Sequence, residues 1–587
     1  MTRGTLGTAL KCVALSVALS VALSAAVRDV AIADAAERGD VATVRALLKQ
    51  GADVSTAQGD GMTALHWAAM NGDAPLATLL LGAGANTRAA TRINRYTPLM
   101  LAARQGHGPV VKALLDGGAD PKAETDNGTT VLMFAAASGD VASVEAIAAR
   151  GVDLNARETV RGLTAAMFAA AANHAGVVTA LGKAGADLQA TSDPLDLRVI
   201  DRSRFKGVLF GNPEPPKEPG GEAGSVEGGG GRNGGNVSGR NNSVYAPPAG
   251  PVRVPGVDRD FSGNELVHTH GGMTPLLFAA REGHIATATA LLDAGVDVNQ
   301  AKLGDNTTPL VEAAINGHFD LAKVLLERGA NPNRSAINGL TPLYAVINIE
   351  WSPRAGGAKL RAYKDQKLSY LETMALLLDK GADPNARLAT RVWYGGNLSG
   401  VNEIGATSFW RAAYASDIAA MQLLVSRGAD PHITTTKGLS RPPTDDGQRE
   451  YREVVNRVPV PAGGPGVPPL VAAAGVGYGE GFAGNTHNFA PTGMMAAVKY
   501  LVEELGADVN ATDHEGNTAM HNAAARGDVE MILYLVAKGA DPRAVNREGK
   551  TTADMANGPV QRIQPWPEAL ALLEKLGAVN NHRCVSC

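Results

Sequence analysis

The sequence predicts a mainly α-helical solenoid, in which short helix–turn–helix units with β-turn fingers stack in a row and irregular insertions interrupt the row. Two phrases carry this prediction: Thr-Pro-Leu followed by two or three apolar residues and Ala-Ala, and Gly-Ala-Asp about twenty residues later. Where nothing is inserted, both phrases return every 33 or 34 residues, and a fixed period of that length indicates a repeat architecture. Full copies of the first phrase begin at Thr97, Thr274, Thr308 and Thr341, looser copies at Thr63, Thr130, Thr164 and Thr518, and copies of the second phrase at Gly51, Gly118, Gly381 and Gly539.

Each element of the unit follows from its residue types, taken in order. The threonine is a good helix N-cap, and the proline after it suits the first helical position, where no amide donor is needed. The next residues, such as Leu65, Trp67 and Ala68, form a short helix with one apolar face. A pair such as Gly72-Asp73 turns the chain into a second helix with a Val-x-x-Leu-Leu core, which ends at a glycine. Because neither helix can bury its face alone, neighbouring units must stack.

The phrase and its spacing resemble the ankyrin repeat over most of the chain outside the insertions. We count roughly eleven or twelve units. The first begins at about Val30 and lacks the opening phrase, and the last, at 551–578, has degenerate copies of both phrases. The resemblance implies that His66 and His521, at the histidine position of the phrase, tie adjacent turns together by hydrogen bonds. It also implies that first helices and finger tips form a concave surface that binds a protein partner.

The N-terminal residues 1–26 have the pattern of a secretory signal peptide. The basic residues Arg3 and Lys11 precede an apolar stretch, and Ser24-Ala25-Ala26 offers small residues for cleavage. An N-terminal membrane anchor is the alternative. No later segment is long and apolar enough to span a membrane, so we expect an exported chain in the periplasm or outside the cell.

The rest of the chain divides into two repeat blocks and several insertions. We expect an N-terminal block of about five units, a C-terminal block of about six, and a flexible Gly/Pro-rich insertion between them. Insertions between a closing and an opening phrase should leave one edge of the solenoid, and those between the helices of a unit the other edge. The expected ranges are 27–192 for the first block, 193–272 for the central insertion, 273–579 for the second block with insertions near 348–367, 387–406, 432–467 and 475–493, and 580–587 for the tail.

Two insertions carry candidate partner-binding residues. Trp351 lies in one of them, and Arg391, Trp393 and Tyr394 lie in the next finger. Tryptophan, tyrosine and arginine are the residue types most enriched at binding hot spots, which makes these side chains a binding hypothesis. The alternative, which we favour, is that they fold back over the solenoid and shield its edge.

The tail ends in a Cys-x-x-Cys pair formed by Cys584 and Cys587. A local disulfide, a redox pair and half of a zinc site all fit this spacing. The pair also resembles the haem c attachment motif Cys-x-x-Cys-His cut one residue before its histidine, as in exported bacterial proteins that join ankyrin repeats to a cytochrome-c-like segment. The chain as given is expected to hold no haem, and a haem c is expected only if the chain continues past Cys587.

Composition and motifs then limit the classes of function. A formal net charge of -4 over 587 residues gives no basic footprint for nucleic acid. We find no credible pair of nucleophile and base, and no set of three metal ligands. We therefore predict a non-enzymatic scaffold that binds an unidentified protein partner, with an electron-transfer protein truncated within its haem segment as the alternative.

Overall fold

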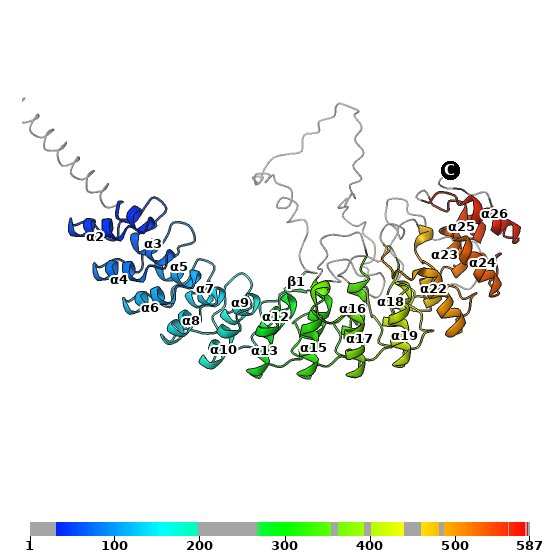
Figure 1. Cartoon of the computed structure of the whole chain (residues 1–587), viewed down its shortest axis with the longest axis horizontal. Coiled ribbons are helices and arrows are strands. Elements are labelled where there is room, and N and C mark those ends of the chain that lie inside the picture. Colours follow the sequence, from blue (N-terminus) through cyan, green and yellow to red (C-terminus); the bar gives the residue numbers. More distant parts are fainter. Residues whose placement is uncertain are drawn as a thin grey trace, which may run out of the picture.

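The structure, a computed structural model, describes residues 31–197, 267, 269–353, 362–392, 401–438, 460–480, 487–560, 563–581 and 584. In these residues, pairs of antiparallel helices stack side by side into a curved row (Figure 1). The first helices of the pairs lie on the inner side of the curve and the second helices on its outer side. Trp393, Tyr394, Cys587 and the expected signal peptide at 1–26 lie outside the described residues.

Twelve units are present in the described part of the chain, five before the central insertion and seven after it, one more than expected in the second block. The first helices are residues 31–37, α3 (Ala64–Met70), α5 (Pro98–Gln105), α7 (Val131–Ser138), α9 (Ala165–Ala171), α12 (Pro275–Glu282), α14 (Pro309–Ile315), α16 (Pro342–Glu350), α18 (Ser408–Tyr414), α20 (Pro469–Ala473), α23 (Ala519–Ala525) and α25 (Thr552–Ala556). The second helices are α2 (Val41–Lys49), α4 (Ala74–Gly82), α6 (Gly108–Asp116), α8 (Val141–Ala148), α10 (Ala175–Ala184), α13 (Ile285–Asp293), α15 (Phe319–Glu327), α17 (Tyr370–Asp379), α19 (Ile418–Ser426), α22 (Gly493–Lys499, continued by the π-helical turn Tyr500–Glu504), α24 (Val529–Ala537) and α26 (Pro567–Lys575). We number the units 1 to 12 by these pairs.

The opening phrase begins the first helices as its residue types predict. The side chain of Thr97 accepts a hydrogen bond from the amide of Met100 at 3.3 Å, and Pro98 occupies the first helical position. The same cap is made by Thr274 and by Thr308. The helix ends on Gly106, whose φ of 72° is in the left-handed region that glycine adopts without steric cost.

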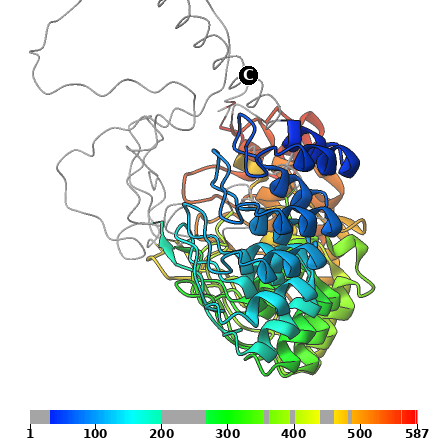
Figure 2. The ribbon, with the colours of Figure 1, turned by 90° about the vertical axis from the view of Figure 1, so that its left-hand side faces the viewer.

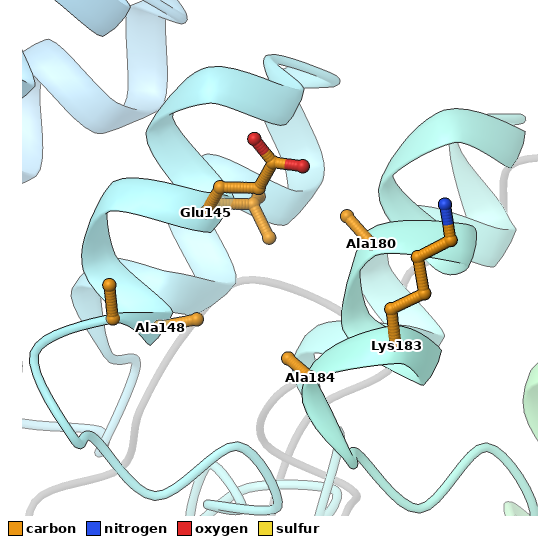
Figure 3. Close-up of a pocket in the computed structure, with 7 residues that line it drawn as sticks. Glu145, Ala148, Ala180, Lys183 and Ala184 are labelled. Atoms are coloured by element: carbon orange, nitrogen blue, oxygen red, sulfur yellow. The ribbon is translucent and has the colours of Figure 1, made fainter.

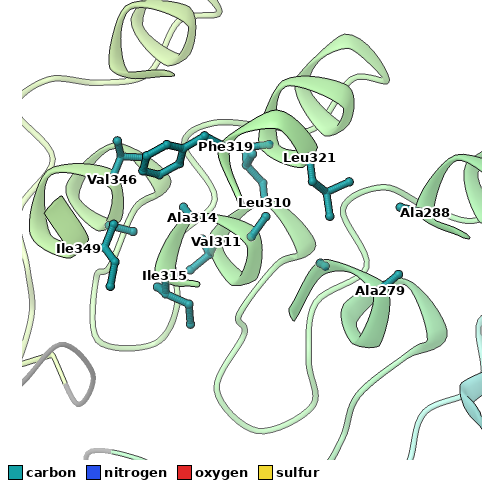
Figure 4. Close-up of a cluster of buried hydrophobic side chains, with 14 of the residues drawn as sticks. Ala279, Ala288, Leu310, Val311, Ala314, Ile315, Phe319, Leu321, Val346 and Ile349 are labelled. Atoms are coloured by element: carbon teal, nitrogen blue, oxygen red, sulfur yellow. The ribbon is translucent and has the colours of Figure 1, made fainter. Parts of the chain in front are cut away.

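The core runs along the whole row between the two helix layers. The small Ala-Ala pairs of the first helices are almost fully buried, so that neighbouring helices approach closely. Figure 4 shows the arrangement around α14, where Val311 and Ala314 lie between Ala279 of α12 and Val346 of α16. Each unit thus contributes its apolar side chains to a single continuous cluster.

The two repeat blocks stack directly on each other across the central insertion. α9 packs against α12 and α10 against α13, as in any other pair of neighbouring units. Several hydrogen bonds join the blocks, among them those from the amide of Met273 to Ser192 Oγ (3.0 Å), from Thr287 Oγ1 to Asn173 Oδ1 (3.0 Å), and between His284 Nδ1 and the carbonyl of Ala170 (3.1 Å). The insertion therefore extends one finger and does not interrupt the core.

The finger insertions leave the bases of their fingers closed. The short strands β1 (Leu195–Asp196) and β2 (Thr269–His270) pair antiparallel where the central insertion begins and ends. The amide of Leu388 donates to the carbonyl of Ala406 at 3.0 Å in the next inserted finger, and that of Thr435 to Val467 at 3.1 Å in the one after it. In Figure 2 the connecting loops lie to the left of the stacked helices.

One predicted insertion boundary is wrong. We expected an insertion from residue 348, but α16 continues to Glu350. The helix is longer because Asn348 and Ile349 are buried, 2% and 6% exposed, and pack into the core instead of leaving it. Among the described helices, none is long and apolar enough to cross a lipid bilayer.

Candidate functional site

The units differ on the inner face in the side chain that stands four residues after the threonine of the opening phrase. This side chain stands on the first helix beside the fingers: in unit 2 it is Trp67, whose Nε1 donates to Gln58 Oε1 in the preceding finger at 2.7 Å. From unit 2 to unit 12 the position is occupied by Trp67, Leu101, Phe134, Phe168, Phe278, Glu312, Ala345, Arg411, Ala472, Asn522 and Met555. Aromatic residues occur at this position only in units 2 to 6, and charged residues only in units 7 and 9.

Units 2, 4, 5 and 6 carry aromatic side chains at this position, and unit 3 carries the buried Leu101. Trp67, Phe134, Phe168 and Phe278 are half-buried and pack with one side against the core, which leaves the other side to solvent. We call these four residues the aromatic stripe. Tyr96, in the finger before α5, extends it by an edge-to-face contact with Phe134, with ring centroids 5.7 Å apart. Because the central insertion leaves units 5 and 6 stacked, the stripe continues from one block to the other.

Arginine side chains lie on these rings. The guanidinium carbon of Arg104 is 5.7 Å from the centre of the Tyr96 ring, and that of Arg281 is 5.1 Å from the centre of the Phe278 ring. A cation over an aromatic face is attracted by the ring quadrupole and holds both side chains in place. Ordered aromatic and arginine side chains lose little conformational entropy on binding, as hot-spot residues require.

The fingers place exposed apolar side chains beside the stripe. Ile93, Val160, Leu303 and Ile337 are 75%, 70%, 46% and 50% exposed, and each lies at the tip of a different finger. We call these four residues the finger-tip row. Isolated exposed apolar residues are common, but a row at equivalent positions of several repeats indicates a contact surface.

From unit 7 onward no aromatic residue occupies the same inner position, and units 7, 9 and 11 hold polar or charged groups there. Glu312 is 7% exposed, and burial raises its pKa to about 7. Its carboxylate receives a long contact of 3.4 Å from Asn316 Nδ2, and the ion pair of Lys302 with Asp305 lies close enough to act on its charge. A carboxyl group in this environment is partly neutral near neutral pH.

Unit 9 contains a buried arginine at this position. Arg411 is 0% exposed, and its guanidinium donates to Asn348 Oδ1 at 2.8 Å and to the carbonyl of Trp351 at 2.6 Å. Glu403, from the finger before it, is also buried and accepts hydrogen bonds from the amide of Val392 and from Tyr344 Oη. Burial raises the pKa of Glu403, while the positive charges of Arg411 and Arg391 lower it.

Trp351, a predicted partner-binding residue, makes its contacts within the chain. Its Nε1 donates to Asp417 Oδ2 at 2.8 Å, and its ring lies edge-to-face with Tyr370 at 6.2 Å. Tyr370 Oη donates to the same carboxylate oxygen at 2.7 Å. The side chain thus closes the edge of units 8 and 9, which is the alternative that the sequence favoured.

Arg391 lies on the finger side of the solenoid, next to Val392, whereas Trp351 lies where α16 ends. The two candidates therefore lie on different parts of their units, one in a finger and one at the end of a first helix. Their companions Trp393 and Tyr394 lie outside the described residues, so a binding role for the set of four stays a prediction.

The structural assignment of His66 is confirmed. Its ring is 0% exposed, and its Nδ1 accepts from the amide of Thr63 at 3.1 Å while Nε2 donates to the carbonyl of Tyr96 at 3.0 Å. Burial lowers the pKa of His66 to about 4, so that the neutral ring links one unit to the next finger. His521 makes the corresponding contact with Thr518.

The tail cysteine is oxidised in the structure. Cys584 is disulfide-bonded, and the other half of the bond lies outside the described residues. A disulfide agrees with one of the alternatives for the Cys-x-x-Cys pair, whereas attachment of haem would require both thiols to be free. The haem hypothesis for Cys584 and Cys587 stays a prediction. Among the described residues no group of three or more His, Cys, Asp or Glu side chains could hold a metal ion.

Two hollows lie between second helices, on the outer side. The first, ≈ 300 Å³, is lined by residues such as Glu145 and Ala148 of α8 and Ala180, Lys183 and Ala184 of α10 (Figure 3). The second, ≈ 710 Å³, lies between α10 and α13, where the two blocks meet. Sites for small molecules are lined mainly by large apolar and aromatic side chains with a few convergent polar groups, and these alanine-rich hollows lack such a lining.

Comparison with known proteins agrees with the architecture. A sequence profile of ankyrin repeats in three copies matches residues 32–125, 99–192 and 257–347, and one of many copies matches 487–536. Together these matches span about half of the chain.

Similar proteins share short segments with the chain. Ankyrin repeat protein L92 of Acanthamoeba polyphaga mimivirus is 40% identical over 57 residues, which are 10% of this chain and 14% of that protein. Protein phosphatase 1 regulatory subunit 27 of Homo sapiens is 35% identical over 69 residues, 12% of this chain and 44% of that protein. Intracellular phospholipase A2 of Caenorhabditis elegans is 35% identical over 78 residues, 12% of this chain and 7% of that protein. The chain thus covers less than half the length of each of these relatives.

Binding on the concave side stays a prediction, and the residues that distinguish this side were not predicted from the sequence. Trp67 was noted only as part of an apolar helix face, and the aromatic stripe and the finger-tip row were not predicted. Aligning the repeats on their threonine and comparing the residue four places later would have found the stripe. The finger-tip row has a weaker signal, because its residues stand four or five places before the threonine in fingers of unequal length.

Proposed function

We propose that this chain, which belongs to the ankyrin-repeat family, is a scaffold that binds a protein partner on the inner face of units 2 to 6. The aromatic stripe is the observation that carries this proposal. Its four rings are held by the core on one side and are open on the other, at equivalent positions of neighbouring repeats. A surface of this kind offers a partner several anchoring points in a row, and no reaction is needed to explain it.

The finger-tip row supports the same face. A partner that lies on the aromatic stripe is also within reach of Val160 and Leu303, which stand at the tips of the fingers beside Phe168 and Phe278. Burying apolar surface contributes about 25 cal/mol per Å² removed from water, so that both rows together give a favourable contact. The relative named as a regulatory subunit of a phosphatase is a further reason to expect a protein partner.

Export is part of the proposal. Residues 1–26 have the pattern of a signal peptide, and Cys584 is disulfide-bonded, a state typical of oxidising compartments. Fractionation of cells that make the full chain, followed by thiol labelling of the tail, tests this point. Recovery of an uncleaved chain with free thiols in the cytoplasm would contradict it.

The direct test of binding uses a photo-activated crosslinking side chain at single positions. Placed at Trp67 or Phe168 in the full chain in its native cells, the crosslinker should trap the same partner from both positions. Ile285 on the outer helix α13 is the matched control, because it is a large apolar residue with a 39% exposed side chain. The same crosslinked protein from Ile285, and none from the stripe, would contradict the proposal.

A second measurement determines the contribution of the stripe to affinity. Phe168→Ala and Phe278→Ala together should weaken the trapped partner's affinity at least about tenfold, since truncation of a hot-spot residue costs more than 1 kcal/mol. Ile285→Ala should leave the affinity within about twofold. Circular dichroism of each variant shows whether the solenoid is intact.

A further inference from the structure

The finger that connects unit 2 to unit 3 is strongly basic. From Ala74 to Leu115 the sequence contains five basic residues and no acidic residue, in a chain whose net charge is -4. Arg88, Arg92 and Arg95 are exposed on this finger, and Arg104 is exposed on the helix that follows it. Their one described ion pair is that of Arg95 with Asp126, at 3.8 Å and with both side chains more than two-thirds exposed. These guanidinium groups therefore remain available to an external carboxylate.

Arg95 has a backbone conformation that the other fingers give to glycine or asparagine. Its φ is 53°, two residues before the threonine of the opening phrase. The residues with positive φ at the equivalent position of other fingers are Gly61, Gly128, Gly162, Gly272, Asn306, Gly339, Gly405, Gly516 and Gly549. An L side chain is crowded by the backbone in this region, whereas glycine is not. Folding alone would favour glycine at residue 95.

The next finger leaves room for this side chain. At the equivalent glycines an added Cβ would meet the following finger: at Gly61 it would lie 2.9 Å from the amide nitrogen of Arg92, and at Gly339 2.6 Å from that of Ala389. Elsewhere one amide of each finger donates to a carbonyl of the finger before it, as Thr159 does to Asn127 at 2.9 Å. Among the described residues this ladder is interrupted after the Arg95 finger, and again after the finger at 431–467.

The tip of the Arg95 finger joins the aromatic stripe. Ile93, with 75% of its surface exposed, is the most exposed large apolar residue in the described part of the chain. Tyr96, three residues later, lies between Arg104 and Phe134, with both of which it is in ring contact. An apolar side chain, several guanidinium groups and an aromatic surface are thus presented together at the N-terminal end of the stripe.

We infer that the Arg95 finger, residues 87–96, is the anchor of the binding face and recognises an acidic protein segment that carries an apolar side chain. This inference rests on the function proposed above and names the chemistry of the partner. Arginine 95 is retained in a strained conformation because its guanidinium, with that of Arg92, pairs with carboxylates of the partner. The apolar side chain of the partner contacts Ile93, and the chain then continues along the aromatic stripe.

The combination of groups favours a protein over a nucleic acid. The four arginines are confined to one finger and the helix that follows it, in a chain that is acidic overall, whereas nucleic-acid binders have a basic stripe along a face. Ile93 would contribute nothing to phosphate contacts, but it complements an apolar side chain flanked by carboxylates. Opposite charges also increase the rate of association, with a dependence on salt.

The test selects peptides from a display library of random sequences on the immobilised full chain. The enriched peptides should combine Asp or Glu with a neighbouring Leu, Ile or Val, and their affinity should fall as salt increases. Arg95→Gly should weaken the selected peptides about tenfold while increasing the resistance of the chain to thermal unfolding. The matched control is Asn306→Gly, which removes a non-glycine residue from the same backbone position of another finger and should leave peptide affinity unchanged.

Three outcomes would overturn the inference. Selected peptides that lose affinity in Phe168→Ala but not in Arg95→Gly or Ile93→Ser would leave the proposed function standing and remove the anchor. Tighter binding of single-stranded DNA than of the peptides at about 0.15 M salt, where charges are screened beyond about 8 Å, would assign the patch to nucleic acid. Peptides that are insensitive to all three variants would count against the proposed function as well.

Discussion

The inner face of units 2 to 6 and that of units 7 to 9 have the same backbone and opposite chemistry. At the same position of the repeat, the first region carries Phe134, Phe168 and Phe278 with one side open to solvent, whereas the second carries buried Glu312 and Arg411. In the first region the side chains contact only their own and neighbouring repeats. In the second, Glu312 contacts its own unit, whereas Arg411 donates a hydrogen bond to the inserted turn at Trp351.

The comparison shows how a repeat array divides its surface. Stacking requires apolar side chains at the buried positions of every unit, but it does not restrict the side chain at the inner position. We propose that units 2 to 6 keep it available for a partner, whereas unit 9 uses it, through Arg411, to hold the turn at Trp351 in place. Large aromatic residues in the insertions, such as Trp351, therefore stabilise the solenoid, whereas those of the repeats themselves are the better candidates for binding.

The largest effect is expected at Arg411. Arg411→Met should lower the free energy of unfolding by about 3–5 kcal/mol, because it leaves the buried Asn348 and the carbonyl of Trp351 without their donor and leaves Glu403 with Arg391 alone as a nearby cation. Denaturant unfolding of the full chain measures this loss. If the variant also abolished partner binding while the solenoid remained folded, the division between the two regions would be wrong.

The next effect depends on pH and concerns Glu312. Burial raises the pKa of Glu312 from 4.5 to about 7, so the unfolded chain releases this proton at lower pH than the folded chain. Stability is therefore lost as the pH rises from 4.5, and the loss of about 3 kcal/mol is complete above pH 7. Glu312→Gln should remove this dependence: the difference in unfolding free energy between the variant and the wild type should grow by that amount between pH 4.5 and 8. A constant difference would show that the carboxyl group is not buried.

A smaller effect is expected at Trp351. Trp351→Phe keeps an aromatic ring but removes the Nε1–H that donates to Asp417. The variant should lose about 2 kcal/mol of unfolding free energy, because the acceptor is charged. The affinity for the partner should not change. A loss of affinity without a loss of stability would show that Trp351 binds the partner, and would contradict the difference between the two regions.

The smallest effect concerns the finger of the first region. Arg95→Gly should raise the free energy of unfolding by about 0.5–1 kcal/mol, since the left-handed backbone is unfavourable for an L side chain and the exposed ion pair with Asp126 contributes little. Asn306→Gly should gain only a few tenths of a kcal/mol, because asparagine tolerates this region better. Equal gains, measured by thermal unfolding, would show that Arg95 is not strained.

The sequence predicted the architecture well because the repeat encodes it locally. A Thr-Pro pair such as Thr97-Pro98 begins a helix in each repeat that contains it, and the constant length of the repeat determines how the units stack. Burial of the insertions could not be predicted, since it depends on contacts such as that of Trp351 with Asp417, which are distant in sequence. The conformation of Arg95 was not predicted either, although aligning the fingers on their threonine places arginine where most fingers have glycine. That Arg95 nevertheless keeps the left-handed backbone is visible only in the structure.

The partner is proposed to bind on the inner face of units 2 to 6. Hydrogen–deuterium exchange of the full chain, with and without the partner trapped by crosslinking, is the decisive measurement for this surface. We predict slower exchange in the fingers and first helices of these units, from 87–105 through 275–282, and no change in the outer helices α8, α10 and α13. Protection confined to the outer helices, or to units 8 and 9 around Trp351, would contradict it.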